Sequence, residues 1–150
     1  MHYFLLPLAV LLSLTIATKA QTTTIQDDFE GNGTITTWFG DDCGANTNFT
    51  NPVQQGINTS ATVLEYDDNG AGQYANLRFD VANNFDLSTH HTFSLKICVP
   101  SSSLTGDQDN QISLKLQDGN IQEPWDTQSE IIKPLVLDQW QTVTLSLIHI

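Results

Sequence analysis

The chain has 150 residues, which is enough for a single domain with a core of its own. It carries 17 acidic and only 5 basic side chains, so its formal net charge is −12 at pH 7. A surface of this charge repels nucleic acid and anionic membranes, and the composition therefore excludes both as electrostatic partners.

Residues 1–20 have the pattern of a secretory signal peptide. An apolar run over residues 4–16 is followed by the small residues that end at Ala20, and this order is typical of a cleaved leader. The alternative is an uncleaved anchor, but the run is shorter than the roughly 20 residues that a membrane span needs. We predict cleavage after Ala20, a secreted or cell-surface location, and no membrane span in the mature chain.

The mature chain predicts β-structure throughout, in one domain over residues 21–144. In the stretch 92–99, Phe93, Leu95 and Ile97 alternate with polar residues, and this period of two predicts antiparallel sheets that share a core. Turn and loop compositions separate such stretches, and none has a helical stripe. We predict a jelly-roll β-sandwich. The expected strands are Thr62–Asp67, 73–81, 92–99, 111–118, 129–137 and 140–147.

Three stretches of the sequence carry a resemblance to a known family. DDFEGNG (27–33), VLEYDDNGAGQYANLRFDV (63–81) and DQWQTVTL (138–145) resemble the jelly-roll carbohydrate-binding modules attached to secreted polysaccharide-degrading enzymes. The resemblance covers most of residues 25–144. It implies a galactose-binding-like sandwich that binds polysaccharide, does not catalyse, and forms the N-terminal part of a larger carbohydrate-active protein.

The same resemblance implies a structural calcium ion. It gives Glu30 as a carboxylate ligand and Asp28 as a backbone-carbonyl ligand. Asp68 is the second carboxylate, with Asp67 as the alternative, and Gln73 adds another carbonyl. Calcium takes about six to eight oxygen ligands of these kinds. However, the DDNG stretch that contains Asp68 also has the ordinary composition of a hairpin turn, which needs no metal.

The end of the sequence departs from this family. In the resembling modules a further strand with an Asp closes the sheet and the metal site, and nothing of this kind follows Trp140. We therefore expect the domain to lack its last strands. Residues 145–150 (LSLIHI) can be encoded by the transposon end that is used to attach sequencing adaptors, and we interpret them as a non-native tail. The alternative is a natural strand of Leu, Ser and Ile.

Sugar-binding proteins use exposed aromatic faces beside side chains that hydrogen-bond to hydroxyl groups. Trp125 lies in a loop with Asp126 and Gln128 close by, and this composition fits a sugar platform. A hydrophobic lid over the core fits it equally well. Trp38 and Trp140 are expected in the core.

A second candidate contact lies on the stretch 73–81. Tyr74, Asn76 and Arg78 alternate with apolar residues, so they share the polar side of one predicted strand. Together with Lys96 and Lys115 they are candidates for the floor of a groove. The alternative for each residue is an ordinary solvated sheet face.

The sequence contains little that predicts catalysis. Cys43 and Cys98 are its only cysteines; export permits a disulfide between them, but free thiols fit equally well. No nucleophile, metalloprotease or phosphate-loop motif is present, and no unique pair of carboxylates of the glycosidase kind can be identified. We expect no catalytic residues. The alternatives to polysaccharide binding are an adhesion or spacer sandwich, and a fragment of a jelly-roll lyase or hydrolase.

Overall fold

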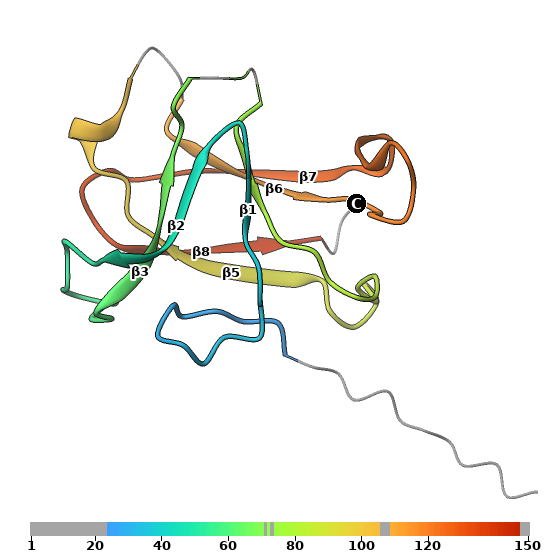
Figure 1. Ribbon diagram of the computed structural model, residues 1–150, viewed down its shortest axis with the longest axis horizontal. Helices are drawn as coiled ribbons and strands as arrows, with labels where there is room; N and C mark the ends of the chain where they lie inside the picture. The colour runs from blue at the N-terminus through green and yellow to red at the C-terminus, as the bar shows by residue number, and fades with distance from the viewer. Residues whose placement is uncertain (1–23, 71, 73, 106–108, 148–150) are drawn as a thin grey trace, which may run out of the picture.

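The computed structural model describes residues 24–70, 72, 74–105 and 109–147 (Figure 1). The predicted signal peptide lies outside the described residues. The regular elements in the described part are short strands and two 3-10 helices. In chain order they are β1 (Phe39–Asp41), β2 (Gly44–Thr50), β3 (Thr62–Asp67), β4 (Asn76–Arg78), β5 (Thr92–Ile97), η1 (Ser101–Ser103), β6 (Gln111–Leu116), η2 (Pro124–Thr127), β7 (Ser129–Pro134) and β8 (Gln141–Ser146).

The strands of the described part pair in antiparallel fashion, and this confirms the predicted all-β class. They form two-stranded sheets with the pairings β1–β4, β2–β3, β5–β8 and β6–β7. The β5–β8 and β6–β7 ladders run over six residues each without a register shift. The β2–β3 ladder is irregular between Asn46 and Phe49, where the register shifts as in a β-bulge.

The observed strand bounds correct several expectations. The prediction for β3 is confirmed, but among the described residues of the stretch 73–81 the strand extends over Asn76–Arg78 only. Neither β1 nor β2 was predicted. Their residues FGD and GANTNFT are rich in Gly, Asp and Asn, which have low strand propensity. These two strands form because they pair with β4 and β3, and the residues of β1 and β2 alone do not indicate such partners.

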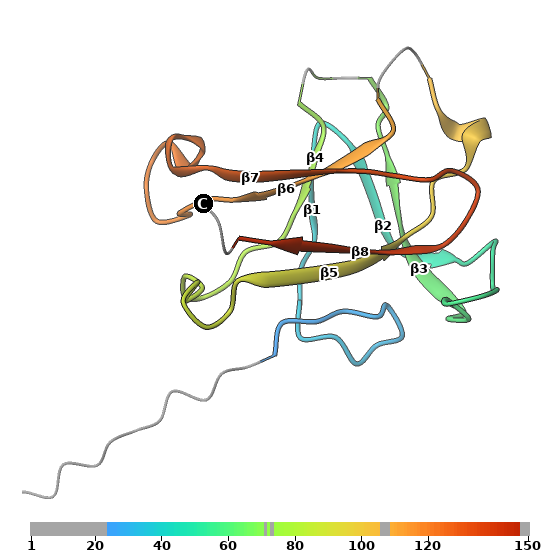
Figure 2. The same cartoon turned by 180° about the vertical axis from the view of Figure 1, so that it is seen from behind.

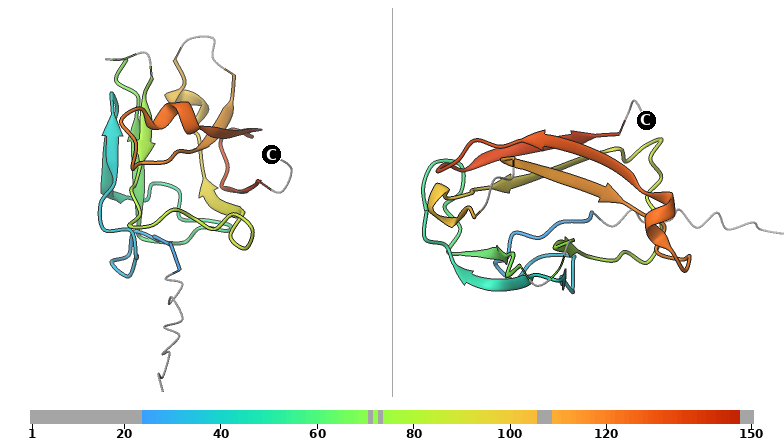
Figure 3. Two further views of the ribbon diagram at one scale, coloured as in Figure 1. Left: turned by 90° about the vertical axis from the view of Figure 1, so that its right-hand side faces the viewer. Right: turned by 90° about the horizontal axis from the view of Figure 1, so that it is seen from above.

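The strand pairs lie in two layers. Figure 3 shows β5, β6, β7 and β8 on one side of the molecule and β2 and β3 on the other. Figure 2 shows the same arrangement from behind, with the β5–β8 and β6–β7 pairs in front. The strands of the first layer run across the view of Figure 1, whereas β2 and β3 run up it.

The most deeply buried side chains come from β8 and the residue after it. Val143, Leu145 and Leu147 are buried, and Leu145 is fully enclosed, whereas the alternating residues of β8 are exposed. Val63 of β3 is the other buried apolar side chain of the described part. Leu145 belongs to the stretch interpreted as a non-native tail, and that interpretation stays a prediction; residues 148–150 lie outside the described residues.

Trp38 and Trp140, which were expected in the core, are half-buried and hold loops by hydrogen bonds and ring contacts, whereas the buried apolar side chains of the described part come from β3, β8 and the residue after β8. The indole N–H of Trp140 donates a hydrogen bond of 2.7 Å to the carbonyl oxygen of Val53. Trp38 packs between the rings of Phe29 and Phe79, with centroid distances of 5.7 and 5.0 Å. Each indole thus buries most of its apolar surface and still has a hydrogen-bond acceptor, because Trp38 donates to Asp27.

Candidate functional site

Two aromatic residues predicted to contact sugar are the most solvent-exposed large apolar side chains of the described part. Tyr74 is 65% exposed and Trp125 is 61% exposed. Trp125 therefore does not act as a lid over the core in this structure. Burying a large aromatic ring is favourable in water, so rings left this open are available for contact with a ligand.

The loop that presents Trp125 is held by hydrogen bonds. Trp125 lies in η2, between Pro124 and Thr127, and η2 joins β6 to β7. The hydroxyl of Thr127 donates to the carbonyl of Pro124 at 2.8 Å and accepts from the backbone N–H of Asp118 at 2.9 Å. The indole is therefore carried by a loop that is closed at its base, which limits the entropy lost when a ligand stacks on it.

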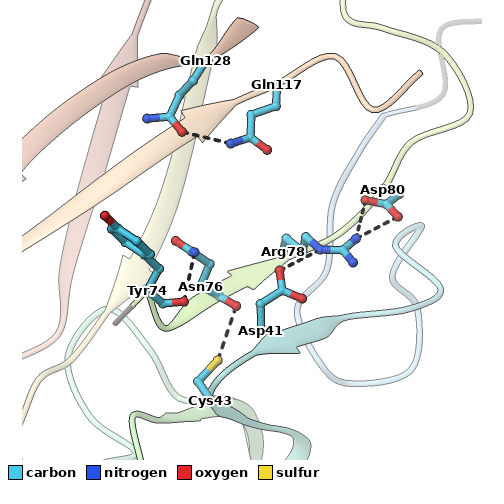
Figure 4. Close-up of polar contacts among 8 residues, drawn as sticks. All are labelled: Asp41, Cys43, Tyr74, Asn76, Arg78, Asp80, Gln117 and Gln128. Carbon is cyan, nitrogen blue, oxygen red and sulfur yellow. Dashed lines mark hydrogen bonds and ion pairs between the residues drawn. The ribbon is translucent and has the colours of Figure 1, made fainter. Parts of the chain in front are cut away.

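The polar neighbours of Trp125 differ in how strongly they are held. Gln128 accepts a hydrogen bond from the side-chain amide of Gln117 at 2.9 Å, as Figure 4 shows. Asp126 is exposed, and in the described part of the chain its carboxylate has no hydrogen-bond partner. Both residues have polar atoms free for further bonds.

Tyr74 and Asn76 lie close together, Asn76 at the first residue of β4 and Tyr74 in the segment before it. The amide of Asn76 donates to the carbonyl of Tyr74 at 3.2 Å, and the hydroxyl of Tyr66 donates to the carbonyl of Ala75 at 3.1 Å. Tyr66 is thereby placed beside this segment, and it is 47% exposed. The sequence reasoning missed Tyr66, although an aromatic residue directly before the acidic turn was a usable signal.

Arg78, the third residue predicted on this strand, is already engaged. Its guanidinium donates to Asp41 at 2.9 Å and to both carboxylate oxygens of Asp80 (Figure 4). It also lies 4.6 Å from the ring centroid of Phe39. The hydrogen bond to Asp80, together with the one to Asp41, raises the pKa of Arg78. These contacts hold β1 to β4 and leave Arg78 little freedom to bind a ligand.

The predicted groups of sugar contacts remain separate. Trp125, Asp126 and Gln128 belong to the β6–β7 connection, whereas Tyr74 and Asn76 belong to β4 and the segment before it. Figure 4 draws the Gln117–Gln128 bond and the Tyr74–Asn76 contact without a bond between them. The two groups therefore form two candidate subsites.

The predicted calcium ligands are also divided. Glu30 accepts a hydrogen bond from the backbone N–H of Thr62 at 2.9 Å, so it lies at the first residue of β3. Asp68 follows the last residue of β3 and accepts from the N–H of Gly70 at 2.9 Å. Six strand residues separate these ends by about 20 Å. The predicted set does not fit one ion in this geometry, and Gln73 lies outside the described residues.

The loop around Glu30 offers a smaller set of oxygens. Asp28 caps the N–H of Glu30 at 3.0 Å through one carboxylate oxygen, and its other oxygen has no partner in the described part of the chain. Both oxygens of Asp27 are occupied, by the N–H of Phe29 and by the indole of Trp38. No group of three or more His, Cys, Asp or Glu side chains suited to a metal occurs among the described residues.

The two cysteines are free thiols. The thiol of Cys43 donates to the carbonyl of Asn76 at 3.4 Å (Figure 4). Burial, followed by the negative charge of Asp41, raises the pKa of Cys43, and burial likewise raises the pKa of Cys98. Both thiols are therefore held in the protonated, weakly nucleophilic form.

Comparisons with known proteins return no relative. No protein-family model, no curated protein and no solved structure matches the chain. Within the described ranges, no helix has the length and apolar character needed to cross a membrane.

Proposed function

We propose that this chain is a secreted, non-catalytic polysaccharide-binding module whose strands form a jelly-roll β-sandwich of the galactose-binding-like kind. The observation that carries the proposal is the exposure of Tyr74 and Trp125, at 65% and 61%. The arrangement of the antiparallel pairs in two layers supports the sandwich (Figure 3). The resemblance of three sequence stretches to carbohydrate-binding modules supports the ligand class.

The chemistry of the two aromatic sites suits sugars. The face of an aromatic ring packs against the C–H patches of a pyranose, and nearby amides and carboxylates bond to its hydroxyl groups. Gln128 and Asp126 supply such groups beside Trp125, and Asn76 supplies them beside Tyr74.

The experiment is affinity electrophoresis of the purified chain in gels that contain a neutral β-glucan, xylan or galactan. Trp125→Ala and Tyr74→Ala should each weaken retention by about fivefold, which corresponds to about 1 kcal/mol of lost stacking. Val136→Ala is the matched control, because Val136 is 56% exposed but is not aromatic. Retention that responds equally to all three changes, or an intact chain that binds none of the polysaccharides, would contradict the proposal.

We also propose a structural calcium ion at the Asp28–Glu30 loop, held without Asp68. The unpartnered oxygen of Asp28 and the carboxylate of Glu30 lie in one short loop, which the Glu30–Thr62 hydrogen bond places beside the first residue of β3. Backbone carbonyls and water complete such sites in other proteins. The ion would reduce the repulsion among the acidic side chains of this loop, and its test is given below.

An adhesion or spacer role is the second candidate, and one observation favours it. Ile132 on β7 and Val136 after it are 50% and 56% exposed, and exposed apolar side chains of this kind are common at protein contacts. Measurement of the molecular mass in solution for the parent and for Ile132→Ser tests this role. A monomer in both cases, together with polysaccharide binding, favours the module over the spacer.

A further inference from the structure

The outward face of the β6–β7 pair carries a row of polar side chains. In the register, Lys115 lies opposite Glu130 and Ser113 lies opposite Ile132. The alternating residues of β6 point to the other face; they are Ile112, Leu114 and Leu116. They are less exposed than Gln111 and Ser113 at the start of the strand. Side chains of opposite parity point to opposite faces of a sheet. This row is therefore the more solvent-accessible face of the pair.

Hydrogen bonds join the row along its length. The amide of Gln117 donates to the side-chain oxygen of Gln128 at 2.9 Å, and the amide of Gln128 donates to Glu130 at 3.5 Å. The hydroxyl of Ser113 donates to the other oxygen of Glu130 at 2.5 Å. The four residues Ser113, Gln117, Gln128 and Glu130 are called the amide–carboxylate row below. The 3.5 Å contact is long for a hydrogen bond, whereas the two shorter bonds restrict the rotamers of Gln117 and Ser113 before any ligand arrives.

The row keeps hydrogen-bonding capacity on its open side. Gln117 retains its carbonyl oxygen and one N–H, Gln128 retains one N–H, and each oxygen of Glu130 has a second lone pair. Donors and acceptors alternate, which suits hydroxyl groups, since each hydroxyl both donates and accepts. From Ser113 to Gln117 the row extends about 13 Å, the rise of four strand residues.

Apolar contacts flank both ends of the row. Trp125 lies in η2, which ends one residue before Gln128, and the backbone N–H of Gln128 donates to the carbonyl of Trp125 at 3.2 Å. At the other end Ile132, opposite Ser113, is 50% exposed. A pyranose chain presents C–H patches as well as hydroxyl rims, and this order of side chains matches both.

We infer that the outward face of β6–β7 is an extended subsite for a neutral polysaccharide, in which Trp125 stacks on one unit and the amide–carboxylate row bonds to the hydroxyls of the next. This inference rests on the proposed function and names its ligand class and its direction along the strands. Neutrality follows from charge. Lys115 and Glu130 balance each other on the face, and the net charge of −12 repels a uronate or sulfated chain.

The test uses the full chain in affinity electrophoresis, with a neutral β-glucan, xylan or galactan and, separately, polygalacturonate. Gln117→Ala and Ser113→Ala should each lower affinity for the neutral polysaccharide by about fivefold, because each removes a hydrogen-bonding group from the row. Thr144→Ala is the control, since Thr144 is exposed on β8 opposite Ser94. Melting curves of the variants should match the parent, because Ser113 and Gln117 are exposed.

The possible outcomes distinguish failure of the extended subsite from failure of the proposed polysaccharide binding. Loss of binding in Trp125→Ala with parental binding in Gln117→Ala and Ser113→Ala overturns the extended subsite and leaves the polysaccharide-binding module standing. Retention by polygalacturonate equal to that by the neutral chains overturns the ligand class. An intact protein that binds no neutral polysaccharide overturns both. If a row variant melts earlier than the parent, Gln117→Glu, which preserves shape and removes the amide donor, must still lower affinity for the inference to hold.

Discussion

The first and second halves of the described chain are held together in different ways. The second half, residues 92–105 and 109–147, forms two ladders of six residues each without a register shift, and the sequences of β5, β6 and β8 alternate between apolar and polar residues. The described residues of the first half, 24–91, form shorter or irregular strands, and side chains of Asp, Asn, Arg and Trp hold these strands and their loops together. The comparison teaches that a regular ladder forms where at least one of the paired strands alternates clearly. Where alternation is weak, polar side chains must fix the backbone instead.

The loop over residues 51–60 illustrates the second strategy. Asn51 and Asn58 are buried, with only 3% and 7% of their surface exposed. Asn51 donates to the carbonyl of Ser60 and accepts from the N–H of Val53, and Asn58 accepts from the N–H of Ser60. A buried amide is stable only when it is hydrogen-bonded in this way. The two asparagines therefore supply the hydrogen bonds that fix the backbone of this loop, as ladder bonds fix the backbone of a strand.

The largest effect is expected in the ladder half. Leu145→Ala should lower the free energy of unfolding by about 3 kcal/mol, because it leaves a cavity at the one fully buried large side chain of the described residues. Urea unfolding followed by tryptophan fluorescence measures the loss. Thr144→Ala, at the exposed neighbour, should change stability little. A Leu145→Ala protein as stable as the parent would contradict this packing and favour the interpretation of residues 145–150 as a non-native tail.

The side-chain half should respond to loss of single polar contacts. Trp38→Phe keeps an aromatic ring between Phe29 and Phe79 but removes the 2.8 Å bond to Asp27. Because the acceptor is a carboxylate, the expected loss is about 2 kcal/mol in the free energy of unfolding. Trp140→Phe is the comparison, since it removes a bond to a neutral carbonyl, and about 1 kcal/mol is expected. Equal losses in the two variants would argue against a special role for the Asp27 carboxylate.

The proposed calcium ion binds the first half of the chain alone, because both proposed ligands, Asp28 and Glu30, lie there. At ten times its dissociation constant, calcium should stabilise the protein by about 1.4 kcal/mol, and chelator should reverse the gain. Glu30→Gln should abolish this gain, whereas Asp68→Asn should keep it, because the two residues lie at opposite ends of β3. Thermal melts with calcium and with chelator are the measurement. Loss of the gain in both variants would favour the original ligand set, and a parent protein that ignores calcium would remove the site.

The smallest effect concerns acid. The backbone N–H of Ser101 bonds to Asp138 and lowers the pKa of that carboxyl below its ordinary value of 3.8. A carboxyl whose pKa is lower in the folded state stabilises the fold above pH 3.8, and this contribution disappears as the pH falls through the folded pKa. Asp138→Asn should therefore melt earlier than the parent at pH 7, and this difference should shrink as the pH falls below 3.8. Asp126→Asn, which removes no side-chain hydrogen bond of the described part, should show no such difference.

Several features of the fold follow from the sequence by itself. Alternation in the stretches that form β5, β6 and β8 predicted the all-β class, because the period of two is a local property of each strand. Only the tertiary structure decided where distant polar groups meet. The pairing of β1 with β4 brings Arg78 into an ion pair with Asp41. The same structure places Glu30 and Asp68 at opposite ends of β3. The physical reason is that pairing partners depend on which surfaces come together in space, and no local pattern of residues contains that information.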